Sequence, residues 1–186
     1  MGKLLRELDL FEPLDLFIKK GLPMFGTCAG LLLLAQKISN DDRTYFRSME
    51  FTAKRNAYGR QLGSFEANAE FQDVGNIPMV FIRAPYIEEV SDNIQILSKV
   101  DGNIVAAKQG NQLVTAFHPE LTNNTSVHEY FLKLLLSINH RNEESMIYII
   151  MPKLRPSQTL CKPPKWCRVE TLQWRFMLCQ ERIGPL

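Results

Sequence analysis

The residue of this sequence best suited to carry out chemistry is Cys28, which lies in the segment Gly26-Thr27-Cys28-Ala29-Gly30. The apolar stretch 23–25 precedes it and a run of leucines follows, which predicts a sharp turn between a buried strand and a helix. A nucleophile on such a turn needs small neighbours, because its backbone is strained and adjacent chain packs closely. The start of the helix would favour a thiolate and offer backbone N–H groups to an oxyanion. A buried structural cysteine between two packing glycines is the alternative interpretation.

A second motif, His118-Pro119-Glu120, could supply the base that a thiol nucleophile needs. Such a base requires a third group to fix its tautomer. Residues two apart in an extended segment point the same way, so His118 and Glu120 can both face one cleft. The alternative is a surface loop with a chance histidine and glutamate. His128, on the helix that follows, is expected to cap that helix or to face solvent.

The hydrophobic pattern of the first 138 residues predicts the scaffold for these two motifs. Helices are expected over 2–20 with an interruption at Pro13, over 31–38, and from Thr125 or Ser126 through Leu136. Strands are expected over 23–25, 49–54, 64–71, 79–83, 94–100, 104–108 and 113–117. Strands that alternate with crossover helices, together with an antiparallel insertion, predict an α/β domain.

Composition limits what kind of protein this is. A length of 186 residues indicates one domain, or two at most. With 45% hydrophobic and 23% charged residues the chain lies in the globular range, which excludes disorder as an overall description. No run of about 18 uncharged apolar residues occurs, so we expect no membrane-spanning helix, and the first residues show no secretory signal. A net charge of +2 indicates no particular partner, nucleic acid included.

The averages conceal a boundary near residue 138. Residues 1–138 carry 14 Lys and Arg against 16 Asp and Glu, whereas residues 139–186 carry 8 against 4. A single cysteine in the acidic first part is typical of a cytoplasmic protein with a free thiol. Cys161, Cys167 and Cys179, in the second part, lack the paired short spacing of a zinc site. We therefore expect 1–138 to form the domain and 139–186 to be an unassigned tail, disordered or non-native, with a membrane or nucleic-acid role as the alternative.

The two motifs together resemble the catalytic triad of class I (triad-type) glutamine amidotransferases. Four further segments narrow the resemblance to the glutaminase subunits of pyridoxal 5′-phosphate synthase: Arg55–Gln61, Ser64–Glu66, Val80–Pro85 and Phe117–Thr122. The resemblance covers about residues 1–138. It implies a flavodoxin-like, three-layer sandwich around a mostly parallel sheet with an antiparallel insertion.

The resemblance also implies an activity and a partner. L-glutamine would be hydrolysed to glutamate and ammonia through a cysteine thioester. The ammonia would pass to a separate synthase (lyase) subunit, in a hetero-oligomer that makes pyridoxal 5′-phosphate (vitamin B6). By this resemblance Cys28 is the nucleophile, His118 is general base and then acid, and Glu120 orients His118. Thioester chemistry needs no metal or bound coenzyme, and the sequence shows no ligand cluster for one.

Three further residues match the glutamine-contacting positions of that family: Arg55, Ile82 and Arg83. A guanidinium suits the α-carboxylate of the substrate, which supports one of the two arginines on chemical grounds. A salt bridge within a hairpin is the alternative role for Arg55. A cysteine hydrolase acting on another substrate is a third interpretation of the chain, which the residues around Arg55 and Arg83 disfavour.

The resemblance is incomplete at the start of the chain. The family begins with a strand, a crossover helix and a Gly-Gly-Glu-Ser loop, and residues 1–5 look like the segment just after that loop. The loop supplies one oxyanion donor, which leaves the backbone N–H of Ala29 as the other. Losing one such donor costs about 10²–10³ in rate, and losing a strand leaves a gap or an exposed edge in the sheet. We therefore expect a weakly active or inactive glutaminase; the alternative is an impaired fragment that only docks on the synthase subunit.

Overall fold

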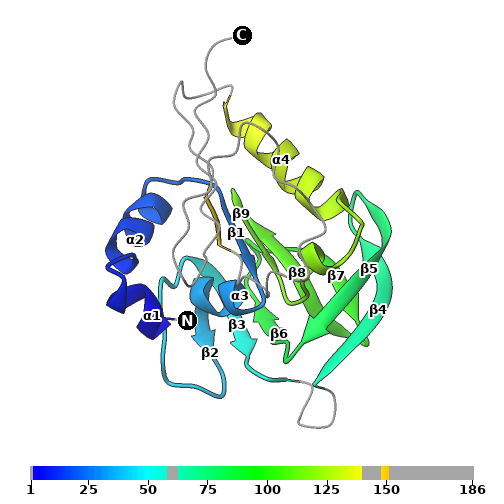
Figure 1. Ribbon diagram of the computed structural model, residues 1–186, viewed down its shortest axis with the longest axis horizontal. Coiled ribbons are helices and arrows are strands. Elements are labelled where there is room, and N and C mark those ends of the chain that lie inside the picture. The colour runs from blue at the N-terminus through cyan, green and yellow to red at the C-terminus, as the bar shows by residue number, and fades with distance from the viewer. Residues whose placement is uncertain (1, 58–62, 140–147, 151–186) are drawn as a thin grey trace.

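The computed structural model describes residues 2–57, 63–139 and 148–150. Within them the chain forms a single open sheet of ten strands with helices packed around it (Figure 1). The helical elements are α1 (Gly2–Glu7), α2 (Phe11–Lys19), α3 (Ala29–Leu34), the 3₁₀ turn η1 (Pro119–Leu121) and α4 (Ser126–Asn139). The strands are β1 (Met24–Thr27), β2 (Ala35–Ile38), β3 (Met49–Lys54), β4 (Ser64–Phe71), β5 (Gly75–Ile82), β6 (Tyr86–Val90), β7 (Gln95–Val100), β8 (Asn103–Gln109), β9 (Gln112–Thr115) and β10 (Tyr148–Ile150).

The strands follow the order β10-β1-β9-β8-β6-β3-β2, and β4, β5 and β7 branch from β8 through the β7–β8 pair. Among the described strands, parallel pairing is confined to β10–β1–β9 and to β2–β3. The α/β class and the antiparallel insertion are confirmed, but the expectation of a mostly parallel sheet needs correction. Three pairs, β4–β5, β7–β8 and β8–β9, join consecutive strands through loops of two or three residues. Loops this short can connect only antiparallel neighbours.

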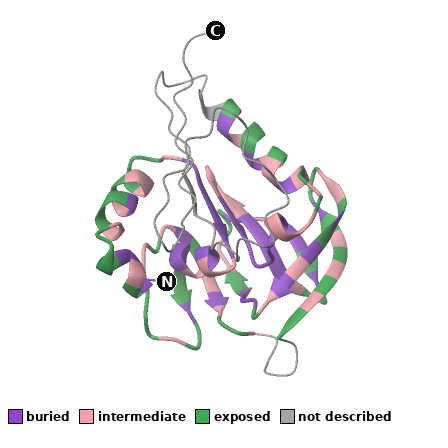
Figure 2. Ribbon diagram, in the orientation of Figure 1, coloured by how far each residue is buried: buried purple, intermediate pink, exposed green. Residues whose placement is uncertain are grey.

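Helices cover both faces of β1, the strand that leads to Cys28. Phe25 packs on Phe131 of α4 with 5.2 Å between ring centroids. The next residue, Gly26, lies against Gly30 and Leu31 of α3. Successive residues of a strand point to opposite faces, so α3 and α4 lie on opposite sides of the sheet at this point. All four residues of β1 are buried (Figure 2), which confirms the expected three-layer arrangement.

Aromatic side chains connect the strands that end at the candidate site. The rings of Phe81 on β5 and Phe117, which follows β9, are both fully buried and make an edge contact with centroids 5.8 Å apart. Burial of a large apolar side chain contributes about 1.5–3 kcal/mol. The contact therefore fixes the backbone immediately before His118 against the end of β5.

The first helical segment is interrupted earlier than the sequence indicated. The helix α1 ends at Glu7, and Asp9 adopts a φ of 54° before α2 begins. Pro13 lies in the first turn of α2, where a missing N–H breaks no helical hydrogen bond. The interruption therefore arises from the left-handed residue Asp9 and not from the proline.

The leucine-rich segment after Cys28 was also predicted incorrectly at its end. The helix α3 stops at Leu34, and Ala35–Ile38 forms β2, paired in parallel with β3. A short apolar run does not distinguish helix from strand by periodicity alone, and the pairing with β3 decides the outcome.

A strand from the second part of the chain lies beside β1. In β10, Tyr148, Ile149 and Ile150 pair in parallel with residues 24–26. The strand β1 is therefore internal, with β10 on one side and β9 on the other, and among the described strands β10 lies at that edge of the sheet. The remainder of 140–186, with Cys161, Cys167 and Cys179, lies outside the described residues, and the division near residue 138 stays a prediction. None of the helices in the described ranges has the length and hydrophobicity needed to cross a membrane.

Candidate active site

Cys28 lies on the sharp turn that the sequence predicted. It has φ 47° and ψ −98°, between the last residue of β1 and the first of α3. Its backbone N–H donates to the carbonyl oxygen of Thr115 on β9 at 2.7 Å, and its Sγ lies 3.8 Å from the carbonyl oxygen of Ile82. A residue with a side chain rarely adopts such a φ. The packed strand and helix on either side hold this strained backbone in place.

Gly26 lies where any side chain would collide with the backbone of α3. An added Cβ would come within 2.8 Å of the carbonyl carbon of Gly30 and 2.9 Å of its oxygen. The first glycine of the motif therefore permits α3 to pack directly against β1 and sets the position of the Cys28 turn.

His118 and Glu120 form the expected pair, by a geometry that differs from the expected one. The backbone N–H of His118 donates to the carbonyl oxygen of Val80 at 2.8 Å. Its Nδ1 lies 2.8 Å from Oε1 of Glu120. The segment is not extended, because residues 119–121 form the 3₁₀ turn η1 and this turn brings the carboxylate back to the ring. The other carboxylate oxygen, Oε2, is buried and has no hydrogen-bond partner within the described residues.

The charge state of His118 depends on burial and on its two neighbours. Burial opposes the imidazolium and is the largest single influence on the pKa of His118. Hydrogen bonding to Cys28 and to Glu120, and the charge of the Glu120 carboxylate, together outweigh burial and raise this pKa from 6.5 to about 9. The imidazole therefore carries a proton at neutral pH, next to the sulfur.

The sequence analysis expected His128 to cap its helix or to face solvent, but its ring points toward the sheet. Its ring makes an edge contact with Phe25, with centroids 6.0 Å apart, between α4 and the sheet. Burial lowers the pKa of His128, although the nearby Glu120 charge acts in the opposite direction. His128 is therefore neutral at pH 7 and is part of the packing of α4 against β1.

The predicted substrate-contacting residues meet at Cys28. A cleft of roughly 250 Å³ is lined by Cys28, Ala29, Arg55, Ile82 and Arg83, among other residues. His118 and Glu120 do not line this cleft. They lie behind Cys28, which His118 contacts by a hydrogen bond. The backbone of Arg83 has φ 46°, and its N–H donates to the carbonyl oxygen of Gly63 at 2.8 Å. The cleft thus combines the thiol of Cys28 with the guanidinium groups of Arg43, Arg55 and Arg83.

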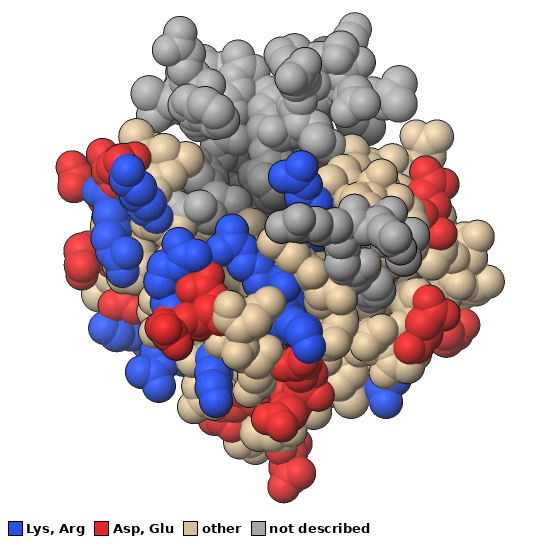
Figure 3. All heavy atoms as spheres, turned by 90° about the horizontal axis from the view of Figure 1, so that it is seen from below, with Lys and Arg blue, Asp and Glu red and all other residues tan. Residues whose placement is uncertain are grey.

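Two charged residues of the cleft, Asp41 and Arg43, were missed by sequence reasoning. They lie in the loop between β2 and β3, where Asp41 contacts both Arg43 and Arg55. Arg55 does form a salt bridge, but with Asp41 of this loop, and the expected hairpin is absent because β3 pairs with β2 and β6 and not with β4. Figure 3 shows basic and acidic side chains intermixed on the face seen from below. Nothing local in residues 40–43 reveals that Asp41 has Arg55 as its spatial partner.

The described ranges contain no cluster of three or more His, Cys, Asp or Glu residues able to hold a metal ion. Tyr58, Gly59, Arg60 and Gln61, which belong to the resemblance around Arg55, lie outside the described residues.

The model of the SNO glutamine amidotransferase family matches residues 1–137. This chain belongs to that family. The match ends within α4, so it includes Cys28, His118, Glu120 and every described residue of the cleft. The expected fold class and the expected family are thereby confirmed, whereas the roles of individual residues remain predictions.

Curated relatives of this family member are pyridoxal 5′-phosphate synthase subunits PdxT. The protein of Desulfitobacterium hafniense is 54% identical over 131 residues, which cover 70% of this chain and 66% of the relative. That of Bifidobacterium longum is 52% identical over 139 residues, covering 72% and 73%. A crystal structure of a glutamine amidotransferase matches with a TM-score of 0.67 and 37% identity, covering 72% of this chain and 71% of the other. The chain thus spans just under two thirds of the length of the Desulfitobacterium protein and a little under three quarters of the other two.

Proposed function

We propose that this chain is a glutaminase that hydrolyses L-glutamine through a thioester on Cys28 and supplies the ammonia to a pyridoxal 5′-phosphate synthase subunit. The observation that supports this best is the strained Cys28 turn beside a protonated, Glu120-bound His118. A buried structural cysteine would need neither the strained backbone nor a charged imidazole next to its sulfur.

The proposed reaction assigns each proton to a named atom. In the reactive pair the proton of Cys28 already lies on the His118 imidazole, and the thiolate sulfur attacks the side-chain carbonyl carbon of glutamine. The backbone N–H of Ala29, the first residue of α3, donates to the oxygen that becomes negative. The His118 imidazolium then protonates the departing nitrogen, which leaves as ammonia. The imidazole, now neutral, takes a proton from the water that attacks the thioester, which releases glutamate and restores the thiolate beside the imidazolium.

The cleft provides contacts for the amino-acid end of the substrate. We assign Arg55 and Arg83 to the α-carboxylate, because a guanidinium presents a fixed fork of donors to a carboxylate. Ile82 lies beside the Cys28 sulfur through its carbonyl oxygen, and this position suits a contact with the substrate near the reacting carbon. Glu120 keeps the His118 ring oriented through Nδ1.

The partner is inferred from the curated relatives, which are subunits of pyridoxal 5′-phosphate synthase. Because ammonia at neutral pH is lost to protonation and diffusion, a glutaminase that serves a synthase is expected to deliver it within a hetero-oligomer. We include neither nucleic acid nor membrane among its partners, and a cytoplasmic location stays a prediction.

The proposal is tested by chemical labelling and by turnover. The chain is incubated with a diazo-ketone analogue of glutamine, and the adduct is mapped by mass spectrometry. Ammonia release from glutamine is measured with the synthase subunit present. Both measurements are repeated on a version preceded by the N-terminal segment of the Desulfitobacterium relative. We expect labelling and turnover that depend on Cys28 in at least the extended version.

The matched controls are Cys28→Ala, which should abolish labelling and turnover, and Cys161→Ala, which should change neither. An adduct on a cysteine other than Cys28, or ammonia release that persists in Cys28→Ala, would overturn the proposal. So would the failure of both versions to release ammonia.

A further inference from the structure

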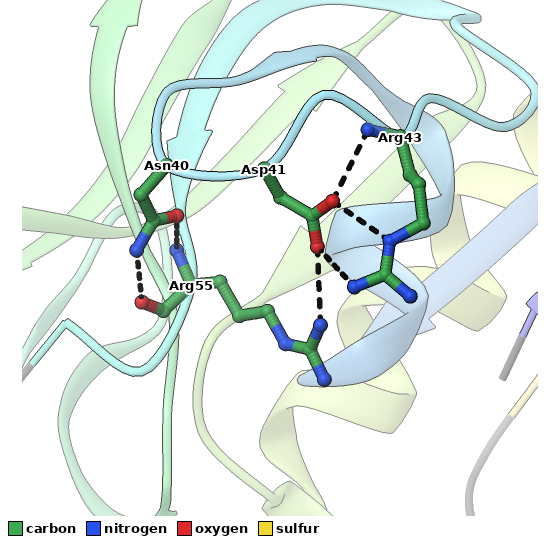
Figure 4. Close-up of polar contacts among 4 residues, drawn as sticks. All are labelled: Asn40, Asp41, Arg43 and Arg55. Carbon is green, nitrogen blue, oxygen red and sulfur yellow. Dashed lines mark hydrogen bonds and ion pairs between the residues drawn. The ribbon is translucent and has the colours of Figure 1, made fainter.

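The backbone of Arg55 is held in place by the side chain of Asn40 (Figure 4). The amide nitrogen Nδ2 of Asn40 donates to the Arg55 carbonyl oxygen at 2.8 Å, and the amide oxygen Oδ1 accepts from the Arg55 N–H at 3.0 Å. The side-chain amide thus pairs with both backbone groups of one residue, as a neighbouring strand would. This pairing fixes the backbone directly after β3, at the residue whose side chain lines the cleft.

The guanidinium of Arg55 is held by Asp41, the residue that follows Asn40. Oδ2 of Asp41 accepts from Nη1 of Arg55 at 3.1 Å (Figure 4). The same carboxylate accepts from Nε of Arg43 at 2.8 Å and from its Nη2 at 2.6 Å, and also from the Arg43 backbone N–H at 3.1 Å. The Asp41 side chain is only 12% exposed, whereas that of Arg55 is 46% exposed. A fixed anion therefore holds an otherwise mobile cation.

Arg43 accounts for the ionised state and the position of Asp41. Its hydrogen bonds, followed by that of Arg55, hold the pKa of the Asp41 carboxyl well below its usual range. Because the Arg43 guanidinium engages both carboxylate oxygens, most of the Asp41 charge is compensated before Arg55 is considered. Arg55 uses one N–H on Asp41 and retains others for a ligand.

The ion pair between Asp41 and Arg55 is better suited to orienting the Arg55 side chain than to stabilising the fold. Exposed ion pairs contribute little to folding free energy. A long side chain that is ordered before a ligand arrives, however, loses less conformational entropy on binding. Asp41, Arg43 and Arg55 carry a net positive charge together, and Arg83 and Lys3 line the same cleft. The electrostatic balance therefore still favours a carboxylate.

We propose that Asp41 is a positioning residue that holds the Arg55 guanidinium at the mouth of the Cys28 cleft for the α-carboxylate of an amino-acid amide. This inference rests on the proposed glutaminase function, and it adds the residue that sets the affinity for the substrate's amino-acid end. In this role Asp41 acts on the α-carboxylate through Arg55, whose guanidinium it holds.

The test compares the same substitution at two adjacent positions. Asp41→Asn removes the charge that Arg55 contacts, and Asp42→Asn alters an exposed neighbour. Steady-state glutaminase kinetics are measured on the version that shows Cys28-dependent turnover. For Asp41→Asn we expect KM for glutamine to rise about tenfold while kcat changes less than about twofold, because a binding contact is weakened. We expect Asp42→Asn to match the parent.

Two further measurements separate positioning from a general structural effect. With L-glutamine α-amide, which lacks the α-carboxylate, the parent and Asp41→Asn should have the same KM. In an Arg55→Lys background, Asp41→Asn should add little to the effect of Arg55→Lys alone. Arg43→Lys, which removes the fork that holds Asp41, should raise KM less than Asp41→Asn and serves if that variant fails to fold.

Several results would overturn the inference about Asp41. These are equal kinetics for Asp41→Asn and Asp42→Asn, a lower KM in Asp41→Asn, and a KM effect that persists with the α-amide. If Asp41→Asn does not fold, an unchanged KM in Arg43→Lys has the same meaning. Absence of Cys28-dependent ammonia release from the parent and from Asp42→Asn alike would instead reject the proposed function, and the inference would fall with it.

Discussion

The chemistry proposed for Cys28 depends on a buried imidazole that keeps its proton. Glu120 contributes both a hydrogen bond and a negative charge to the raised pKa of His118. In the parent we therefore expect the NMR titration of the His118 ring to have its midpoint near pH 9. Glu120→Gln should move the midpoint clearly lower, because the amide keeps a similar shape but loses the charge. A parent midpoint at or below 6.5, or a midpoint that Glu120→Gln leaves in place, would contradict this account.

The catalytic consequence of the pair can be ranked by substitution. His118→Asn should reduce glutaminase turnover almost as much as Cys28→Ala, because members of a catalytic unit are not additive. Glu120→Gln should cost less, because an amide can still orient the ring in part. The three kcat values, measured side by side on a version with Cys28-dependent turnover, check this order. A larger loss for Glu120→Gln than for His118→Asn would show that the roles are wrongly assigned.

Gly26 offers a separate test of how the Cys28 turn is built. Gly26→Ala places a Cβ against the Gly30 carbonyl. Because backbone cannot rotate away as a side chain can, we expect a loss of about 1–3 kcal/mol in the free energy of unfolding. Denaturant titration measures it, with Gly63→Ala as control, since an added Cβ there meets nothing within 4 Å. Equal stabilities for the two variants would mean that α3 can move away from β1.

Local residue patterns predicted the two motifs but only part of the surrounding site. The Cys28 turn follows from small residues at fixed spacing, and a histidine two residues before a glutamate suffices to suggest their pairing. The 3₁₀ turn that joins the pair was not foreseen, because proline is compatible with both extended and turn geometry. Asp41 was missed because its contact with Arg55 is tertiary. Sequence spacing carries no information about such a contact.

The same limit applies to strands and helices. The strands β3 and β4 have the predicted bounds, because alternating apolar residues mark a half-buried strand directly. The strands β2, β6 and β10 were not predicted. None has more than five residues, and each becomes a strand by pairing with other parts of the chain: β2 with β3, β6 with β3 and β8, and β10 with β1. Strands this short therefore depend on partners that no local pattern reveals.

The pairing of β10 with β1 can be tested by two truncations. A chain of residues 1–150 retains β10, whereas a chain of residues 1–147 loses it together with its three register pairs with β1. We expect the shorter chain to melt a few degrees lower, since about 1 kcal/mol shifts the midpoint of a domain this size by roughly 2–8 °C. Thermal unfolding followed by circular dichroism compares the two. Identical midpoints would show that β10 contributes nothing to the sheet.

The stability of the whole domain should depend on pH through two histidines that shift in opposite directions. His118 has a raised pKa when folded, so its contribution is fully present below pH 6.5 and is lost as the pH rises through about 9. His128 has a lowered pKa when folded. Its burial costs nothing above pH 6.5, and stability falls below that pH because the unfolded chain binds the proton more readily. Stability should therefore be greatest near pH 6.5 and decline on both sides.

Removing either histidine should flatten one side of this profile and leave the other unchanged. In His118→Asn the decline between pH 6.5 and about 9 should shrink, because the group that releases its proton there is gone. In His128→Gln the decline just below pH 6.5 should shrink instead. Melting temperatures measured across this range for the parent and both variants decide the matter. If His128→Gln flattened the alkaline side, or His118→Asn the acid side, the two titrations would be wrongly assigned. The structural account of which ring holds its proton beside Glu120 would then be overturned.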